Sequence, residues 1–362
     1  MSMRWAWRGW INSFNEKKAK IIAIIPNFLP FISFLIPMMI LYCFEPLSFE
    51  KTWKGRTYYM FFLWLFIFET ILAYGELRAT KKLNGIKSPR TIAFAIFLLI
   101  PTIYVITANF YGLNSMIRTY ASQNLKMADY FAGNMPICIE YLIFASLFIV
   151  IAFLQYGKKG LKFYSIAIFL LTAVGTIYMI DNFYPEGSFT PFQIIVPTTV
   201  TLAAIVLNVL GYNAQILPPY KNAPVLRVSD SQGNYSVFAV AWPCSGVDSL
   251  LLYTATILLF LKRSSITTLR KTIYFLIGAV ITYFINILRI ATIFIISLNG
   301  GDWRIFHDLY GSLYSITWII VYPILIVGME SLFSKIKKRR LMHKENSGNP
   351  EVNYGNGTLP FK

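Results

Sequence analysis

The stretch KTIYFLIGAVITYFINILRIATIFIIS occupies residues 271–297 and is apolar over nearly its whole length. As a helix rising about 1.5 Å per residue, it exceeds the roughly 30 Å hydrocarbon core of a bilayer. With 56% hydrophobic and only 14% charged residues among 362, the composition excludes an ordinary soluble domain and predicts an all-α polytopic membrane protein. Further apolar runs lie at residues 21–44, 57–75, 91–111, 137–155, 163–180, 191–211, 247–262 and 312–334.

The positions of the basic residues predict the orientation of the chain in the membrane. Most of the 33 lysines and arginines lie in five segments, at residues 1–20, 76–90, 156–162, 262–271 and 335–362. Clusters that alternate with apolar runs follow the positive-inside pattern, so the net charge of +17 indicates membrane topology and no nucleic-acid partner. We therefore expect a multi-pass protein of the cell membrane with both termini in the cytoplasm.

The number of apolar runs conflicts with this orientation unless one run does not cross. Nine crossings from a cytoplasmic N-terminus would leave the basic residues 337–340 outside. The run 191–211 is the best candidate for a re-entrant or interfacial helix, because it contains the polar residues Thr198, Thr199, Thr201 and Asn208. About eight transmembrane helices then remain, and Cys244 lies on the extracytoplasmic side.

The segment between this run and Cys244 contains two β-rich stretches, at residues 225–228 and 235–240. The turn-forming sequence 230–234 separates them, so they predict a small extracytoplasmic β-hairpin. Such a hairpin would either hold Cys244 at a fixed height above the membrane or merely connect two helices.

Cys244 lies in Ala-Trp-Pro-Cys-Ser-Gly-Val-Asp-Ser (241–249), where a polar loop gives way to an apolar helix. Ser245 and Asp248 match a capping box, with Ser245 as the N-cap and Asp248 as its acidic partner. A thiol just before a helix N-terminus would have a lowered pKa, and the free backbone N–H groups there would stabilise an oxyanion. Ser and Asp in this pattern are most often plain caps, so a structural interpretation stays open.

Cys43 and Cys138 lie within or at the ends of apolar runs and are expected to behave as small hydrophobic side chains. Three separated cysteines and two histidines form no zinc-binding pattern. We expect no metal and no cofactor.

Arg289 lies within Asn-Ile-Leu-Arg-Ile (286–290), deep in an apolar run where a charge usually faces a polar interior. It is 18 residues from Lys271, or roughly 27 Å along a helix, which places it near the predicted side of Cys244. Asn286 lies on the same helical face. Alternatively, Arg289 extends to the outer interface or pairs with a structural acid such as Glu140.

His307 is the histidine on the predicted outer side, four residues before Gly311. A neutral imidazole would take the proton of Cys244 and later donate it to a leaving amine, as in thiol acyl transfer. A loop histidine that is simply solvated is the other interpretation.

Three motifs in this order, Cys244-Ser245-Gly246, the Arg289 stretch and His307-x-x-x-Gly311, resemble the exosortase/archaeosortase family over roughly residues 57–334. The bias toward Ile, Lys and Asn favours its archaeal, thaumarchaeal branch. The resemblance implies a membrane-embedded cysteine transpeptidase or protease. Its partners would be secreted proteins with a C-terminal signal made of a motif, a hydrophobic helix and a basic tail. The new C-terminus would pass to an acceptor, in archaea a membrane lipid.

The resemblance also implies roles for individual residues. Cys244 would be the nucleophile, Arg289 would stabilise developing negative charge and His307 would transfer protons. Some archaeal relatives have another residue in place of the histidine. Supporting positions are Ser245, Gly246, Asp248 and Asn286.

The chain then divides into three parts. Residues 1–56 form a cytoplasmic segment and the first transmembrane helix, 57–334 the catalytic core, and 335–362 a basic, disordered cytoplasmic tail. Competing interpretations are a transporter with a polar path along Arg289, Glu69 and Glu140, a non-catalytic membrane partner, or a membrane acyltransferase that acts on lipid alone.

Overall fold

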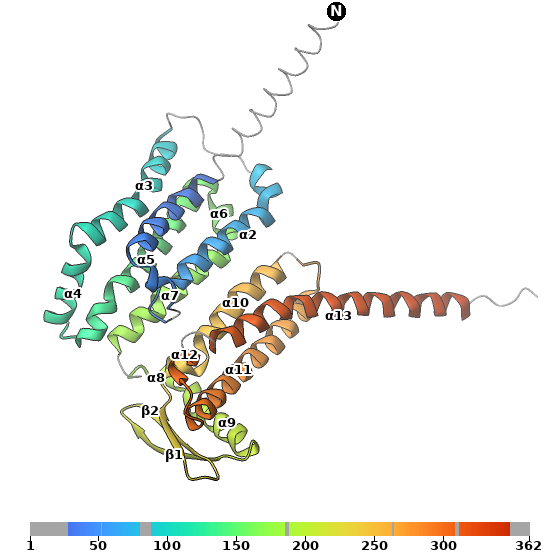
Figure 1. Ribbon diagram of the computed structural model, residues 1–362. Coiled ribbons are helices and arrows are strands. Elements are labelled where there is room, and N and C mark those ends of the chain that lie inside the picture. Colours follow the sequence, from blue (N-terminus) through green and yellow to red (C-terminus); the bar gives the residue numbers. More distant parts are fainter. Residues whose placement is uncertain are drawn as a thin grey trace, which may run out of the picture.

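The computed structural model describes residues 28–51, 53–79, 88–184, 188–262, 264–307 and 311–347. They form two helical units and a small sheet at one end (Figure 1). The predicted basic segment 1–20 and the end of the tail, 348–362, lie outside these residues.

The helices and strands follow one another along the chain, starting with an apolar helix at Phe28–Phe44. The later elements are η1 (Pro46–Phe49), α2 (Thr57–Ala79), α3 (Pro89–Phe110), α4 (Leu113–Gln123), α5 (Asp129–Tyr156), α6 (Lys158–Phe163), α7 (Ser165–Phe183), α8 (Thr190–Gln193), α9 (Ile195–Val209), β1 (Asn213–Tyr220), β2 (Ala223–Ser229), β3 (Tyr235–Ala239), η3 (Trp242–Ser245), α10 (Val247–Lys262), α11 (Thr268–Leu298), α12 (Trp303–Ile305) and α13 (Gly311–Ser347).

Six helices of the described chain are long and apolar enough to cross a membrane. They are α2, α3, α5, α7, α11 and α13. Phe28–Phe44, α9 and α10 are apolar but have only 15 to 17 described residues, at or below the roughly 17 to 25 that a span needs. A multi-pass membrane protein is therefore confirmed, whereas the predicted count of about eight spans is not.

The first helical unit contains α2, α3, α5, α7 and the helix Phe28–Phe44, packed around an aromatic core. Phe34 meets Phe144 and Phe148 edge to face, with ring centroids 5.9 and 5.6 Å apart. The helices α5 and α7 approach closely at Gly175, where a Cβ atom would lie only 2.9 Å from the Leu142 side chain.

The second helical unit contains α10, α11 and α13. The α10 helix also packs against α7, and a partly buried ion pair joins the two units there, between Lys262 Nζ and Glu69 Oε1 at 2.6 Å. Glu69 accepts hydrogen bonds from the backbone N–H groups of Ile166 and Ala167 as well. The Glu69 carboxylate thus accepts hydrogen bonds from free backbone N–H groups at the start of α7 and neutralises the charge of Lys262 in the last turn of α10.

The predicted hairpin is confirmed as β2 and β3, whose turn is held by the Asp230 side chain. The sequence did not predict β1, which pairs with β2 to make a three-stranded antiparallel sheet. Pro218 and Pro219 argue against a strand, but β1 is an edge strand with a shifted register between Leu217 and Tyr220, where missing N–H groups are tolerated.

The run 191–211 forms α8 and α9, and α9 packs against β1, β2 and α11 (Figure 1). Val196 and Val200 of α9 share a buried cluster with Leu226 and Val228 of β2. Its 15 residues make α9 shorter than the six candidate spans. A re-entrant position in the bilayer stays a prediction.

The last helix, α13, runs through residues 335–347, which the sequence analysis assigned to a disordered tail. Lys, Arg, Leu, Met and Glu predominate there and are strong helix formers, which explains why the helix continues past the apolar run.

Candidate active site

Cys244 lies in a tight turn between the sheet and α10. The 3₁₀ turn η3 begins at Trp242, and the Cys244 backbone N–H donates to Ala241 O at 2.9 Å. Gly246 follows with φ +102°, which favours glycine, and a Cβ atom there would lie 3.2 Å from Asn286 Nδ2. Glycine is therefore required both for the backbone and for the close approach of α11.

The predicted capping box is wrong. Ser245 lies inside the 3₁₀ turn, and its buried hydroxyl donates to Trp242 O at 2.5 Å. The Asp248 carboxylate accepts a hydrogen bond from the Tyr58 hydroxyl of α2 at 2.9 Å. A short sequence pattern reveals neither the 3₁₀ turn nor a partner 190 residues away.

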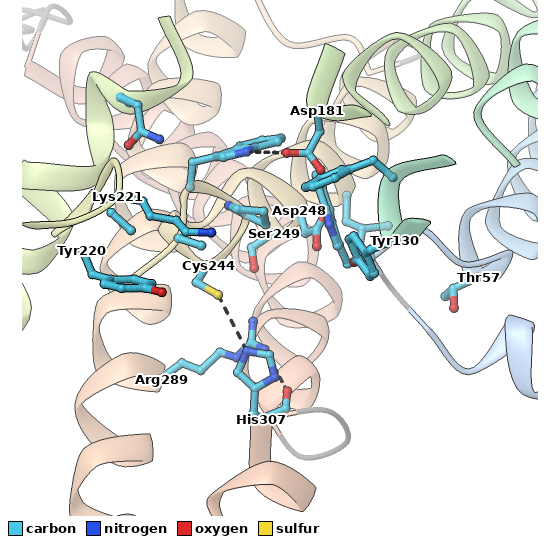
Figure 2. A pocket seen from close by; sticks show the side chains of 18 of the residues that line it. Thr57, Tyr130, Asp181, Tyr220, Lys221, Cys244, Asp248, Ser249, Arg289 and His307 are labelled. Carbon is cyan, nitrogen blue, oxygen red and sulfur yellow. Dashed lines mark hydrogen bonds between the residues drawn. The ribbon is translucent and has the colours of Figure 1, made fainter. Parts of the chain in front are cut away.

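The three predicted catalytic side chains meet in one place (Figure 2). Cys244 Sγ lies 3.7 Å from His307 Nε2, within hydrogen-bond range for sulfur. Arg289 Nη2 donates to the His307 carbonyl at 2.9 Å, and Asn286 Nδ2 donates to the Cys244 carbonyl at 2.9 Å. Arg289 and Asn286, both on α11, thus hold the backbone of His307 and Cys244.

A pocket of about 510 Å³ surrounds this cluster. Cys244, Arg289 and His307 line it together with apolar and aromatic side chains from both helical units and with the β1–β2 turn at Tyr220 and Lys221. The volume falls in the range of sites that bind small ligands or short peptide segments.

The electrostatics of the thiol differ from the expectation. Burial raises the pKa of Cys244, the Arg289 guanidinium opposes this increase, and the Asp248 carboxylate adds to it. A position before a helix thus does not activate the sulfur by itself, because desolvation of a thiolate outweighs the favourable charge. At rest Cys244 is therefore a thiol, and a reaction in which it attacks as a nucleophile would need a base; His307 Nε2, 3.7 Å from Sγ, is close enough to serve as one.

Residues 29–322 match a protein family described as transmembrane exosortase. The chain belongs to this family. The match includes Cys244, Arg289 and His307 as well as most of the helix Phe28–Phe44. Comparisons with curated proteins and with solved structures found no match.

Sequence reasoning missed the residues that hold the η3 turn of this exosortase. The indole N–H of Trp242 donates to Asp181 Oδ1 at 2.7 Å, and Lys54 Nζ binds Asp181 Oδ2 at 2.5 Å. All three side chains are buried, and Trp53 packs edge-on against Trp242 with centroids 4.9 Å apart. Asp181 at the end of an apolar run was the available signal, but its partners lie in distant segments.

The other buried acids of the exosortase belong to separate networks. Glu140 binds Arg56 through two contacts of 2.8 and 3.1 Å, and Glu69 binds Lys262. A pairing of Arg289 with Glu140 is therefore wrong. Glu69 and Glu140 do not line the pocket that Arg289 lines. The described residues contain no group of three or more His, Cys, Asp or Glu that could hold a metal ion.

Proposed function

We propose that this exosortase is a cysteine transpeptidase that cleaves C-terminal sorting signals of secreted proteins and transfers the new C-terminus to a membrane lipid. The observation that carries the proposal is the 3.7 Å approach of Cys244 Sγ to His307 Nε2 in a pocket that Arg289 also lines. A thiol beside an imidazole, with a fixed cation close by, is the arrangement that acyl transfer requires.

In the first step, His307 Nε2 takes the thiol proton while Sγ attacks the scissile carbonyl carbon. The negative charge that develops on the carbonyl oxygen is stabilised by the Arg289 guanidinium. Arg289 Nε is buried and has no hydrogen-bond partner among the described residues, so a substrate oxygen would supply one. Collapse breaks the C–N bond, His307 returns the proton to the leaving amine, and a thioester remains on Cys244.

In the second step, an acceptor amine or hydroxyl attacks the thioester carbonyl. His307 takes the acceptor proton, the C–S bond breaks, and the thiol is regenerated. The apolar and aromatic lining limits water in the pocket, which favours transfer over hydrolysis.

The membrane topology supports this assignment of substrates. A hydrophobic helix followed by a basic tail would insert with its basic end in the cytoplasm and its cleavage motif at the outer surface. The positive-inside pattern predicts the same extracytoplasmic face for the Cys244 pocket, with both termini in the cytoplasm. A membrane lipid is also within reach of a pocket at this surface.

The test is the processing of a co-expressed secreted protein that carries a C-terminal motif, helix and basic tail. Wild type is compared with Cys244→Ala and Cys244→Ser, and Cys43→Ala is the matched control because Cys43 is exposed and does not line the pocket. We expect a mass change of the substrate with wild type and Cys43→Ala, and none with either Cys244 variant at equal membrane levels.

The mass of the product separates the chemical outcomes. A product heavier than the hydrolysed fragment by one lipid supports transfer, whereas only hydrolysed fragment with lipid present would overturn it. Unchanged processing by Cys244→Ala would remove the thiol from catalysis and leave a non-catalytic membrane partner as the better interpretation.

A further inference from the structure

A second pocket lies at the far ends of α10 and α11 from Cys244. Its volume is about 590 Å³, and it forms where the turn between α6 and α7 meets the end of α10 and the start of α11. Cys244 precedes α10, whereas Leu258, Leu261 and Lys262 line this pocket, so the two sites are separated by roughly 20 Å of helix.

Three lysines from three elements converge on this pocket, namely Lys162 of α6, Lys262 of α10 and Lys271 of α11. Lys262 is already neutralised, because its ammonium binds Glu69 and also donates to Phe163 O and Ser165 Oγ. Within the described chain, Lys162 and Lys271 have no acidic partner. The pocket therefore has two uncompensated positive charges.

The remaining wall of the pocket is apolar and consists mainly of Ile166, Leu258, Leu261 and Phe275. Leu258, on α10 of this membrane protein, is 38% exposed. A small inorganic anion would make no use of this wall. A lipid would use both parts, its phosphate against the ammonium groups and its chains against the apolar side chains.

We propose that this pocket binds the phosphate headgroup of an anionic membrane lipid. Lys162 and Lys271 contact the phosphate, and Leu258 and Phe275 contact the acyl or isoprenoid chains. The lipid bridges the first helical unit, through α6 and α7, and the second, through α10 and α11. The proposal does not depend on the chemistry of Cys244.

Basic residues gather on one face of any membrane protein, so the test must separate this pocket from general charge. Lys158 and Lys159 lie on the same short helix as Lys162, are exposed and do not line the pocket. The variant Lys158→Gln/Lys159→Gln removes as much charge as Lys162→Gln/Lys271→Gln and is its matched control.

The experiment is native mass spectrometry of the full chain released from bilayers of equal parts phosphatidylglycerol and phosphatidylcholine. We expect wild type and Lys158→Gln/Lys159→Gln to retain phosphatidylglycerol selectively. Each lysine near an anionic headgroup contributes about fivefold in affinity, so Lys162→Gln/Lys271→Gln should bind phosphatidylglycerol about 25-fold more weakly. Thermal unfolding of both variants in detergent checks that they are folded.

Three results would overturn the proposal: equal retention of both lipids by wild type, equal loss in the two double variants, or displacement of the bound lipid by millimolar inorganic phosphate. The last would identify a site for a soluble anion. Loss confined to Lys162→Gln/Lys271→Gln, without displacement by phosphate, would establish the lipid site.

Discussion

The Cys244 thiol of this exosortase is partly buried and its pKa is raised, so the proposed attack by this sulfur would depend on a neighbouring base. His307 is the described group at hydrogen-bond distance from Sγ. Arg289 acts on both partners, because it opposes the rise of the Cys244 pKa and holds the His307 backbone. Arg289 thus influences both the pKa of Cys244 and the position of His307.

Replacement of His307 by Gln should slow substrate processing about 10²- to 10⁴-fold at neutral pH, the usual contribution of a general base. Because the thiol pKa is raised, the fraction of thiolate at neutral pH is small and grows with pH up to that pKa. Residual activity of His307→Gln should therefore rise about tenfold per pH unit between pH 7 and 9. Processing rates across this range provide the measurement, and a wild-type rate for His307→Gln at neutral pH would show that Cys244 does not need the imidazole.

Replacement of Arg289 by Gln should lower the rate of processing by about 10²- to 10³-fold, because a donor to the developing oxyanion is lost. Arg289→Lys should recover only part of the rate, since an ammonium group cannot serve the His307 carbonyl and a substrate oxygen in the same planar geometry. Arg304→Gln, at an exposed position near the site, is the control. Equal rates for all three variants would assign Arg289 a purely structural role.

At the scale of elements, the 3₁₀ turn that contains Cys244 is held by groups from three directions. Trp242 ties it to Asp181 of α7, Asp181 ties it to Lys54 before α2, and Asn286 ties it to α11. Because the 3₁₀ turn is short, its position depends on the contacts of these side chains.

Two variants test the Asp181 network. Asp181→Asn leaves the buried Lys54 ammonium without its carboxylate and should lower the free energy of unfolding by about 3 to 5 kcal/mol. Trp242→Phe keeps an aromatic side chain, though a smaller one, and removes the indole N–H donor, so it should cost only about 1 to 3 kcal/mol while lowering the processing rate. Thermal unfolding and processing are measured together, with Glu50→Gln, an equal loss of charge at an exposed position, as the control. A wild-type rate in folded Trp242→Phe would show that the hydrogen bond does not position Cys244.

The helical elements were largely predictable, because every apolar run beyond residue 27 became a helix and the hairpin followed from its turn signal. The edge strand β1 was not predictable, since its two prolines argue against a strand unless its position at the edge of the sheet is known. The capping box failed for a related reason. Ser245 and Asp248 find their partners through tertiary contacts, which override a local pattern.

At the scale of the whole molecule, the sequence pointed to the three candidate residues because each interrupts a regular pattern: a thiol at a helix boundary, a charge in an apolar helix and a histidine in a loop. It could not predict the pocket, since Trp53, Tyr130 and Asp181 line it with these residues only when the two helical units pack together. The sequence also did not determine the number of membrane spans, because helices of 15 to 17 residues are close to the minimum length that crosses a bilayer.

The ion pair between the two units should contribute more to stability than an exposed pair. Glu69→Ala leaves Lys262 and the start of α7 without their acceptor and should cost about 3 to 5 kcal/mol. Arg270→Gln breaks the more exposed pair with Glu330 and leaves the Tyr274 hydrogen bond to Glu330 in place, so it should cost about 1 kcal/mol or less. Unfolding of the detergent-solubilised protein provides the comparison. Similar losses for both variants would show that the junction at Glu69 does not join the units.

The residues that line the Cys244 pocket come from two separate parts of the chain. Cys244, Arg289 and His307 all come from the part after the sheet, whereas Trp53, Thr57, Tyr130, Phe131 and Asp181 come from the first helical unit. Substitutions in the N-terminal half of the chain can therefore change the residues that would face a substrate without altering Cys244, Arg289 or His307. We expect new specificities in this family to arise mainly in the N-terminal half, and chimeras joined between α7 and α9 to take their choice of signal from that half.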